Sequence, residues 1–238
     1  MNTQTKKIGS IAIFYLIAIS LRYYIAIIEP DFLSDLSIYL QILALGIGPL
    51  IGGLIVVKFL NRPNFLSLFS LGFWKTIAII AIPVILFSLV GILKTGIPYF
   101  TAPKIAATIL LYALFEEFGW RGYLQSELSD LKNIYKYLII TVLWFIWHLN
   151  FELSINNLLF FLLLFAGSYG IGFMANKSKS LVVAALFHSL SNLMQIELFA
   201  EIEFSYKLII IIISAFATYF IVRSSKSIIS KKAKTQLM

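Results

Sequence analysis

The sequence has no cysteine and little charge. Without a thiol among its 238 residues, the chain can form neither a disulfide nor a thiolate metal site, and it has no cysteine nucleophile. Only 13% of the residues are charged, about half of the share found in soluble domains. Hydrophobic residues make up 60%, and the mean hydropathy is +0.93. We therefore expect residues 1–238 to form a single domain embedded in a membrane.

Signatures of several enzyme classes are also missing. The sequence contains no Walker loop, no GxSxG nucleophile elbow and no HExxH zinc helix. The net charge of +8 would suit a nucleic-acid partner. However, the basic residues gather in the predicted cytoplasmic loops and tails, as is usual in membrane proteins. We expect contact with membrane lipid and no nucleic-acid partner.

Long apolar segments make up most of the chain. A hydrocarbon core about 30 Å thick is crossed by about 20 apolar helical residues. The segments close to that length are 8–28, 37–60, 72–93, 104–128, 133–149, 155–174, 180–198 and 206–223. The sequence thus predicts an all-α polytopic bundle of about eight spans.

Charged residues sort to opposite sides of these segments. With the N-terminus in the cytoplasm, the outer side keeps only four of the 19 Lys and Arg residues, Arg22, Lys94, Lys104 and Lys207. The acidic residues expected there are Glu29, Asp31, Asp35, Glu152, Glu197, Glu201 and Glu203. Retention of Lys and Arg on the cytoplasmic side is the usual determinant of topology. We expect a multi-pass protein of the cell membrane with both termini in the cytoplasm.

Three ionisable residues interrupt the fourth segment. Glu116 and Glu117 are adjacent, and Arg121 follows Glu117 at the i+4 position. Each would cost about 2.5–3.5 kcal/mol if it were charged and unpaired at the bilayer centre. An ion pair between Glu117 and Arg121 lowers that cost. It leaves Glu116 without a structural explanation, which favours a catalytic base.

Two later segments carry polar side chains at a similar depth. His148 and His188 are the two histidines of the chain, and Asn192 follows His188 at i+4. At 1.5 Å per residue, Glu116, His148 and His188 lie roughly 14–18 Å from the nearest flanking lysine. A lone membrane histidine is usually a helix contact, but three polar groups at one depth suggest a site.

These residues resemble the motifs of the CAAX-protease and bacteriocin-processing (CPBP) family of intramembrane proteases, also called Abi. The family pattern is EExxxR, FxxxH and HxxxN on separate membrane helices. This chain has the first as Glu116 to Arg121 and the third as His188 and Asn192. The second departs from it, because Trp144 precedes His148 by four residues. We read this as a bulky apolar replacement. The resemblance covers about residues 100–195.

The resemblance implies a role for each residue. Glu116 and His148 would activate a water molecule, and His188 with Asn192 would form the oxyanion hole. Glu117 and Arg121 would brace the helix. An alternative stays open, in which Glu116, His148 and His188 hold zinc as a two-histidine, one-carboxylate set.

The function expected from this resemblance is an intramembrane endopeptidase. Its substrate would be a prenylated protein tail, a bacteriocin or pheromone precursor, or a lipid-anchored peptide. One alternative is a non-catalytic membrane scaffold or bacteriocin-immunity protein of the same fold. A proton-coupled transporter would also use membrane carboxylates, but it predicts an internal repeat, and none is evident.

Overall fold

The structure is a computed structural model that describes residues 3–96, 100–195 and 202–235. Its α-helices are α1 (Thr3–Tyr23), α2 (Ile38–Phe59), α3 (Phe73–Thr95), α4 (Thr101–Glu117), α5 (Gln125–Glu127), α6 (Asn133–Trp147), α7 (Ile155–Ser178), α8 (Leu181–Gln195) and α9 (Phe204–Thr235). Its irregular helical segments are η1 (Tyr24–Ile28) and η3 (Phe118–Leu124), both π-helical, and the 3₁₀ turn η2 (Asp31–Leu33). The all-α prediction is confirmed.

Helices occupy all eight predicted spans. Five stretches are long and apolar enough to cross a membrane by length and composition, namely Gln4–Ile28, Ile38–Phe59, Phe73–Lys94, Ile155–Ser178 and Phe204–Ser225. The helix that begins with α4 continues through η3 into α5. Helices α6 and α8 are shorter, and their 15 residues each extend about 22 Å. The two short helices are the ones that carry the histidines.

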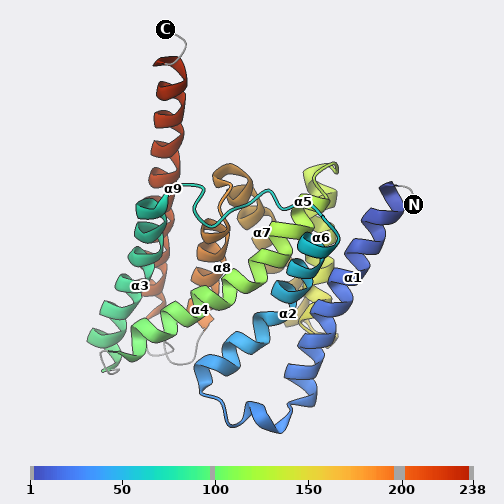
Figure 1. Cartoon of the computed structure of the whole chain (residues 1–238). Coiled ribbons are helices and arrows are strands. Elements are labelled where there is room, and N and C mark those ends of the chain that lie inside the picture. Colours follow the sequence, from blue (N-terminus) through green and yellow to red (C-terminus); the bar gives the residue numbers. More distant parts are fainter. Residues whose placement is uncertain (1–2, 97–99, 196–201, 236–238) are drawn as a thin grey trace.

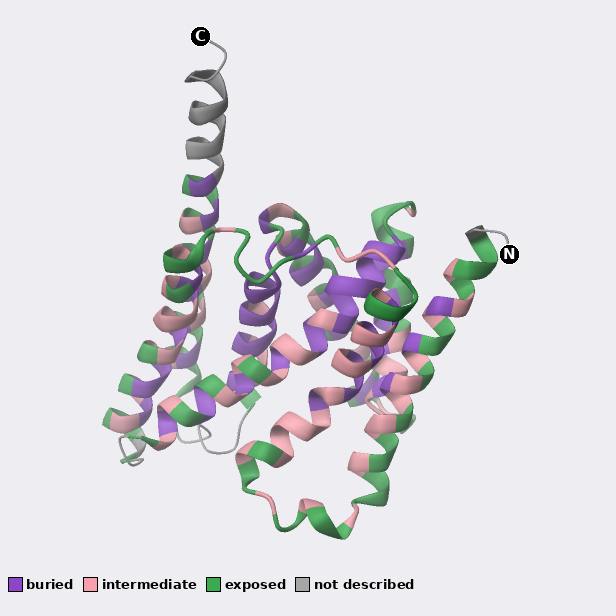
Figure 2. Cartoon of the chain, in the orientation of Figure 1, coloured by how far each residue is buried: buried purple, intermediate pink, exposed green. Residues whose placement is uncertain are grey.

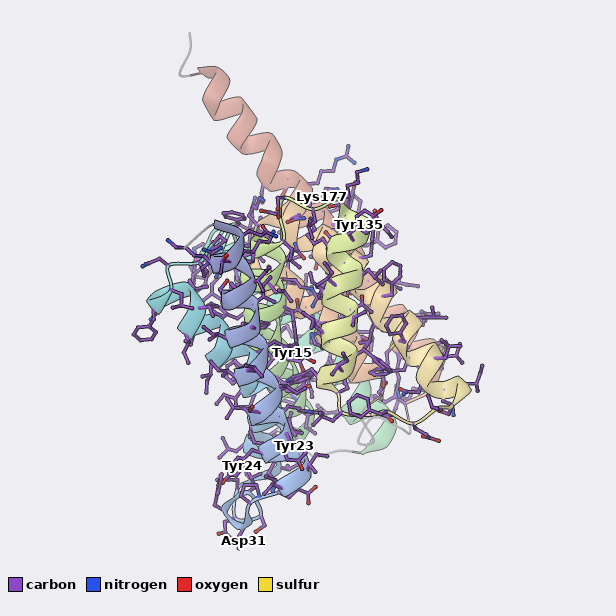
Figure 3. All side chains as sticks on the ribbon, turned by 90° about the vertical axis from the view of Figure 1, so that its right-hand side faces the viewer. Tyr15, Tyr23, Tyr24, Asp31, Tyr135 and Lys177 are labelled. Carbon is purple, nitrogen blue, oxygen red and sulfur yellow. The ribbon has the colours of Figure 1, made fainter. Side chains whose placement is uncertain are left out.

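Helix α1 begins and helix α9 ends on the same side of the bundle (Figure 1). An even number of crossings produces this arrangement. Lys177 and Tyr135 lie at the end nearer the C-terminal helix, whereas Asp31 lies at the opposite end (Figure 3). The separation agrees with the predicted sorting of basic and acidic residues. The direction in which the bundle sits in the membrane stays a prediction.

Two apolar clusters hold the helices together. One joins α1, α2, η3, α6 and α7 around Phe14, Trp120 and Trp147. The other joins α3, α4, α8 and α9 around Ile79, Phe87 and Leu186. Helix α4 runs obliquely across the bundle, and burial is concentrated on its continuation η3 and on α8 (Figures 1 and 2). The end of α4, η3 and α8 are therefore the centre on which the site is built.

The backbone changes at Glu117, where α4 passes into η3. The wider π-helical turn shifts the side chains that follow it, and such segments are frequent at functional sites. Gly119 allows α2 to approach this turn, because a Cβ there would lie 2.5 Å from the Pro49 carbonyl oxygen. The position of Glu117 and Arg121 thus depends on a close contact with α2.

A loop of residues 60–72 crosses one end of the bundle on its way from α2 to α3 (Figure 1). The guanidinium of Arg62 pairs with buried Glu127, with Nε 3.0 Å from Oε2. Ser67 forms an isolated parallel bridge with Ser180, between α7 and α8. These contacts tie the loop to the ends of three helices.

One basic residue lies elsewhere than the topology prediction placed it. Arg121 was counted with the inner loops, but it is fully buried inside η3 and paired with Glu117. A charge that is paired inside the bundle gives no topology signal. Arg22, which was counted with the outer side, lies in the last turn of α1 and contacts Trp147 of α6. Glu197, Glu201 and the predicted span end at 196–198 lie outside the described residues.

Candidate active site

Glu116 lies at the centre of the bundle, with a relative exposure of 1%. Its Oε2 accepts a hydrogen bond of 3.0 Å from the indole Nε1 of Trp144 on α6. Its Oε1 has no hydrogen-bond donor among the described residues. A buried carboxylate oxygen without a donor is costly, and it is available to accept a proton. The predicted base is therefore buried and only half satisfied.

Glu117 has partners on both oxygens. Its Oε1 lies 2.9 Å from Nδ1 of His188 on α8, and its Oε2 lies 3.2 Å from Nε of Arg121. The Arg121 guanidinium also stacks over Trp144, with its central carbon 4.7 Å from the ring centroid. The predicted ion pair between Glu117 and Arg121 is confirmed. The contact with His188 was not predicted.

His148 caps the C-terminus of α6. Its Nδ1 lies 2.8 Å from the Trp144 carbonyl oxygen. Because a carbonyl oxygen only accepts, Nδ1 carries the proton of the neutral ring, and Nε2 keeps its lone pair. The ring packs edge-on against Trp147 and Phe160. The local fold thus fixes the tautomer that a general base needs.

One cavity brings three of the predicted residues together. His148, His188 and Asn192 line a space of about 490 Å³ between α6, α7 and α8, together with Trp144. The α7 wall includes Gly167 and Gly170, and a Cβ at either position would meet nothing within 4 Å. Because these two glycines have no side chains, the α7 wall leaves room for a ligand chain.

Trp144 is the functional residue whose role sequence reasoning missed. We expected only a bulky apolar neighbour, but its indole donates to Glu116 and its carbonyl accepts from His148. Its ring also packs on His188, with centroids 5.0 Å apart. One residue therefore contacts three predicted site residues. The sequence carried a sign of this role, because Trp144 stands where the FxxxH pattern has phenylalanine. The indole of tryptophan has a hydrogen-bond donor that phenylalanine lacks.

Comparison with known proteins gives this geometry a context. Residues 98–194 match the family model of the Rce1-like type II CAAX prenyl endopeptidases. Over this segment, the chain is similar to that family. The matched segment runs from the start of α4 to α8, so it includes the site residues Glu116, Glu117, Arg121, Trp144, His148, His188 and Asn192.

A curated relative resembles part of the chain. The chain is 34% identical over 102 residues to CAAX prenyl protease 2 of Methanococcus maripaludis. The match covers 37% of this chain and 38% of the relative. The chain thus resembles a little over a third of that protein. The first three helices lie outside the CPBP match, yet α2 packs directly on η3.

The zinc alternative needs Glu116, His148 and His188 to converge on one ion. Among the residues that the structure describes, no three His, Asp or Glu side chains form a group that could hold a metal ion. Nδ1 of each histidine is engaged by an oxygen atom, and a histidine that binds a metal through Nε2 makes the same kind of contact with Nδ1. The zinc alternative therefore stays a prediction.

Proposed function

We propose that this protein is an intramembrane endopeptidase that activates water with Glu116 and His148. The observation that carries the proposal is the bridge through Trp144, which binds the carboxylate of Glu116 and the ring of His148. His148 shares its cavity with His188 and Asn192. The similarity of residues 98–194 to a peptidase family supports a peptidase, and the geometry supports these roles.

The base is shared between a carboxylate and an imidazole. Oε1 of Glu116 has no hydrogen-bond donor among the described residues, and Nε2 of His148 keeps its lone pair because Nδ1 carries the proton. A water molecule between them loses a proton to this pair as its oxygen attacks the peptide carbonyl carbon. The same proton then passes to the leaving nitrogen, and the C–N bond breaks. General-base assistance of this kind contributes about 10²–10⁴-fold to a rate.

The developing oxyanion needs donors on the opposite side of the carbonyl. The Asn192 amide supplies one. His188 faces Glu117 with Nδ1, which leaves Nε2 as the ring atom that can face the oxyanion, and Nε2 donates there when it carries a proton. Arg121 lies beside Glu117 and balances its charge.

The substrate we propose is a lipid-modified or membrane-embedded peptide. The cavity lies within the bundle, and its wall combines the polar groups with Phe160, Leu163 and Ile171. An extended peptide that carries a lipid group suits this surface, because the peptide can contact the polar groups and the lipid can contact the apolar wall. The relative's name points to prenylated proteins, and a prenylated tail is therefore the first substrate class to test.

The test is cleavage of a lipid-modified peptide library by purified protein in lipid nanodiscs. Wild type and Glu116→Gln are compared, because glutamine keeps the size and the contact with Trp144 while it removes the base. We expect product only with wild type. Equal product from both would overturn the proposed base. Two inert proteins that still bind the peptides would favour the scaffold alternative.

A further inference from the structure

A second cavity lies at the end of the bundle opposite the termini. It holds about 700 Å³ between the end of α1, η1 and the start of α2. Glu29, Asp31 and Gln41 contribute polar groups to its wall, and Arg22 and Leu45 are its neighbours toward the centre. Asp31 marks the tip of this end in Figure 3. The cavity combines charges of both signs, which are stable near a membrane only with water or a partner.

Arg22 connects this cavity with the site. It lies within the membrane-spanning stretch Gln4–Ile28, where an unhydrated arginine is costly. Its guanidinium carbon sits 4.6 Å from the ring centroid of Trp147, the residue before His148. Its Nη1 donates to the Leu45 carbonyl oxygen at 3.3 Å. These contacts hold the guanidinium between the cavity and α6.

Tyr112 continues the connection to Glu116. It lies one helical turn before Glu116 on α4, and it interacts with both Glu116 and Arg22. Gly46 of α2 makes room for the ring, since a Cβ there would approach the Tyr112 ring to 2.8 Å. A row of polar groups therefore runs from the second cavity through Arg22 and Tyr112 to the proposed base.

We propose that this cavity is a water-filled entrance, closed at its inner end by Arg22, through which water reaches Glu116. The proposal rests on the hydrolytic function above, because hydrolysis consumes one water per bond inside the membrane. The two cavities have separate tasks in this scheme. Peptide enters the space beside His148 and Asn192, and water enters beside Arg22. The residues that build the entrance belong to α1, η1 and α2, outside the CPBP match.

The absence of native cysteine allows a direct test, because each variant then carries a single thiol. We compare Leu45→Cys, which faces the cavity, with Tyr23→Cys, which is exposed on the outside of α1 beside Arg22. Asp35→Cys, in the exposed loop and outside the cavity lining, is the accessible reference. The proteins are reconstituted in liposomes and treated on either side with a charged, membrane-impermeant thiol reagent. Thiols react as thiolates, which form in water and not in lipid.

We expect Leu45→Cys to react at least about tenfold faster than Tyr23→Cys, and at a rate approaching that of Asp35→Cys. Ala26→Cys, also on the cavity wall, gives a second reading if Leu45→Cys does not fold. Reaction of Leu45→Cys and Ala26→Cys as slow as that of Tyr23→Cys would overturn the entrance.

A second comparison tests the closure by Arg22. Tyr112→Cys should be protected when Arg22 is present and should react at least about tenfold faster in combination with Arg22→Ala. Arg22→Lys is the control that keeps the charge but loses the planar stack on Trp147. An unchanged rate with Arg22→Ala would overturn the closure. The labelling needs no substrate, so a labelled entrance in a protein that cleaves nothing would overturn the endopeptidase and leave the cavity's hydration established.

Discussion

Two adjacent carboxylates in one helix have opposite surroundings. Glu117 is held by Arg121 and His188, and each of its oxygens lies near a cationic or donor group. Glu116 has one donor, from Trp144, and one oxygen without a donor among the described residues. Adjacent helical positions differ by about 100° in direction, so the two side chains face different helices. The pair shows how one motif gives two neighbouring carboxylates different partners, as the proposed division into a base and a structural residue requires.

The largest expected effect distinguishes the two carboxylates directly. Glu116→Gln should lower kcat by about 10²–10⁴-fold because the general base is lost. Its melting temperature in detergent should stay near that of wild type, because the Trp144 donor can still bond to the amide oxygen. Steady-state cleavage and thermal unfolding measure the two quantities. A large loss of melting temperature would show that Glu116 is a structural residue.

Glu117→Gln should show the reverse pattern. It leaves the buried guanidinium of Arg121 without its counter-charge, and breaking a buried pair costs about 3–5 kcal/mol. We therefore expect a clear fall in melting temperature together with lower activity. The same unfolding measurement checks it. Unchanged stability would mean that the pair with Arg121 contributes little.

The next effect concerns the bridge between base and histidine. Trp144→Phe keeps an aromatic ring but removes the donor to Glu116, and a hydrogen bond to a charged group is worth about 1.5–3 kcal/mol. We expect kcat to change by at least about tenfold with KM nearly constant. Trp147→Phe is the matched control, since its indole donates to the Ala18 carbonyl oxygen instead. Equal effects of the two substitutions would assign Trp144 a packing role only.

A smaller effect is expected from a third carboxylate, at the surface. A side-chain hydrogen bond from Lys7 lowers the pKa of Asp130 from its ordinary value of 3.8. A depressed pKa adds stability above the unfolded value, and that stability is lost as pH falls through the folded value. Asp130→Asn should therefore lower the melting temperature slightly at pH 7 and not at pH 3. A difference that persists at pH 3 would point to a cause other than this charge.

The smallest effect expected is that of a metal chelator. Because the described residues include no group of three metal-ligating side chains, we expect a strong chelator to leave the rate of cleavage unchanged. The rate is compared before and after dialysis against the chelator. Loss of activity, with recovery on addition of zinc, would instead support the two-histidine, one-carboxylate site.

Most of the fold could be predicted because membrane helices follow simple physical rules. A buried span needs about 20 apolar residues, and all eight predicted spans contain helices. Helices α6 and α8 fall within the predicted spans 133–149 and 180–198. The motif order was sufficient to select the residues that now share or adjoin one cavity.

The sequence by itself determined the helical class, the membrane environment, the family resemblance and the candidate side chains, because these depend on composition and on spacing along one helix. Only the tertiary structure decided their partners. It joined His188 to Glu117, made Trp144 the bridge to Glu116, and brought Arg22 beside the site. Each of these contacts joins residues from different helices, and spacing along the chain carries no information about which helix faces which. The π-helical turn after Glu117 and the close approach of α2 at Gly119 settle those directions.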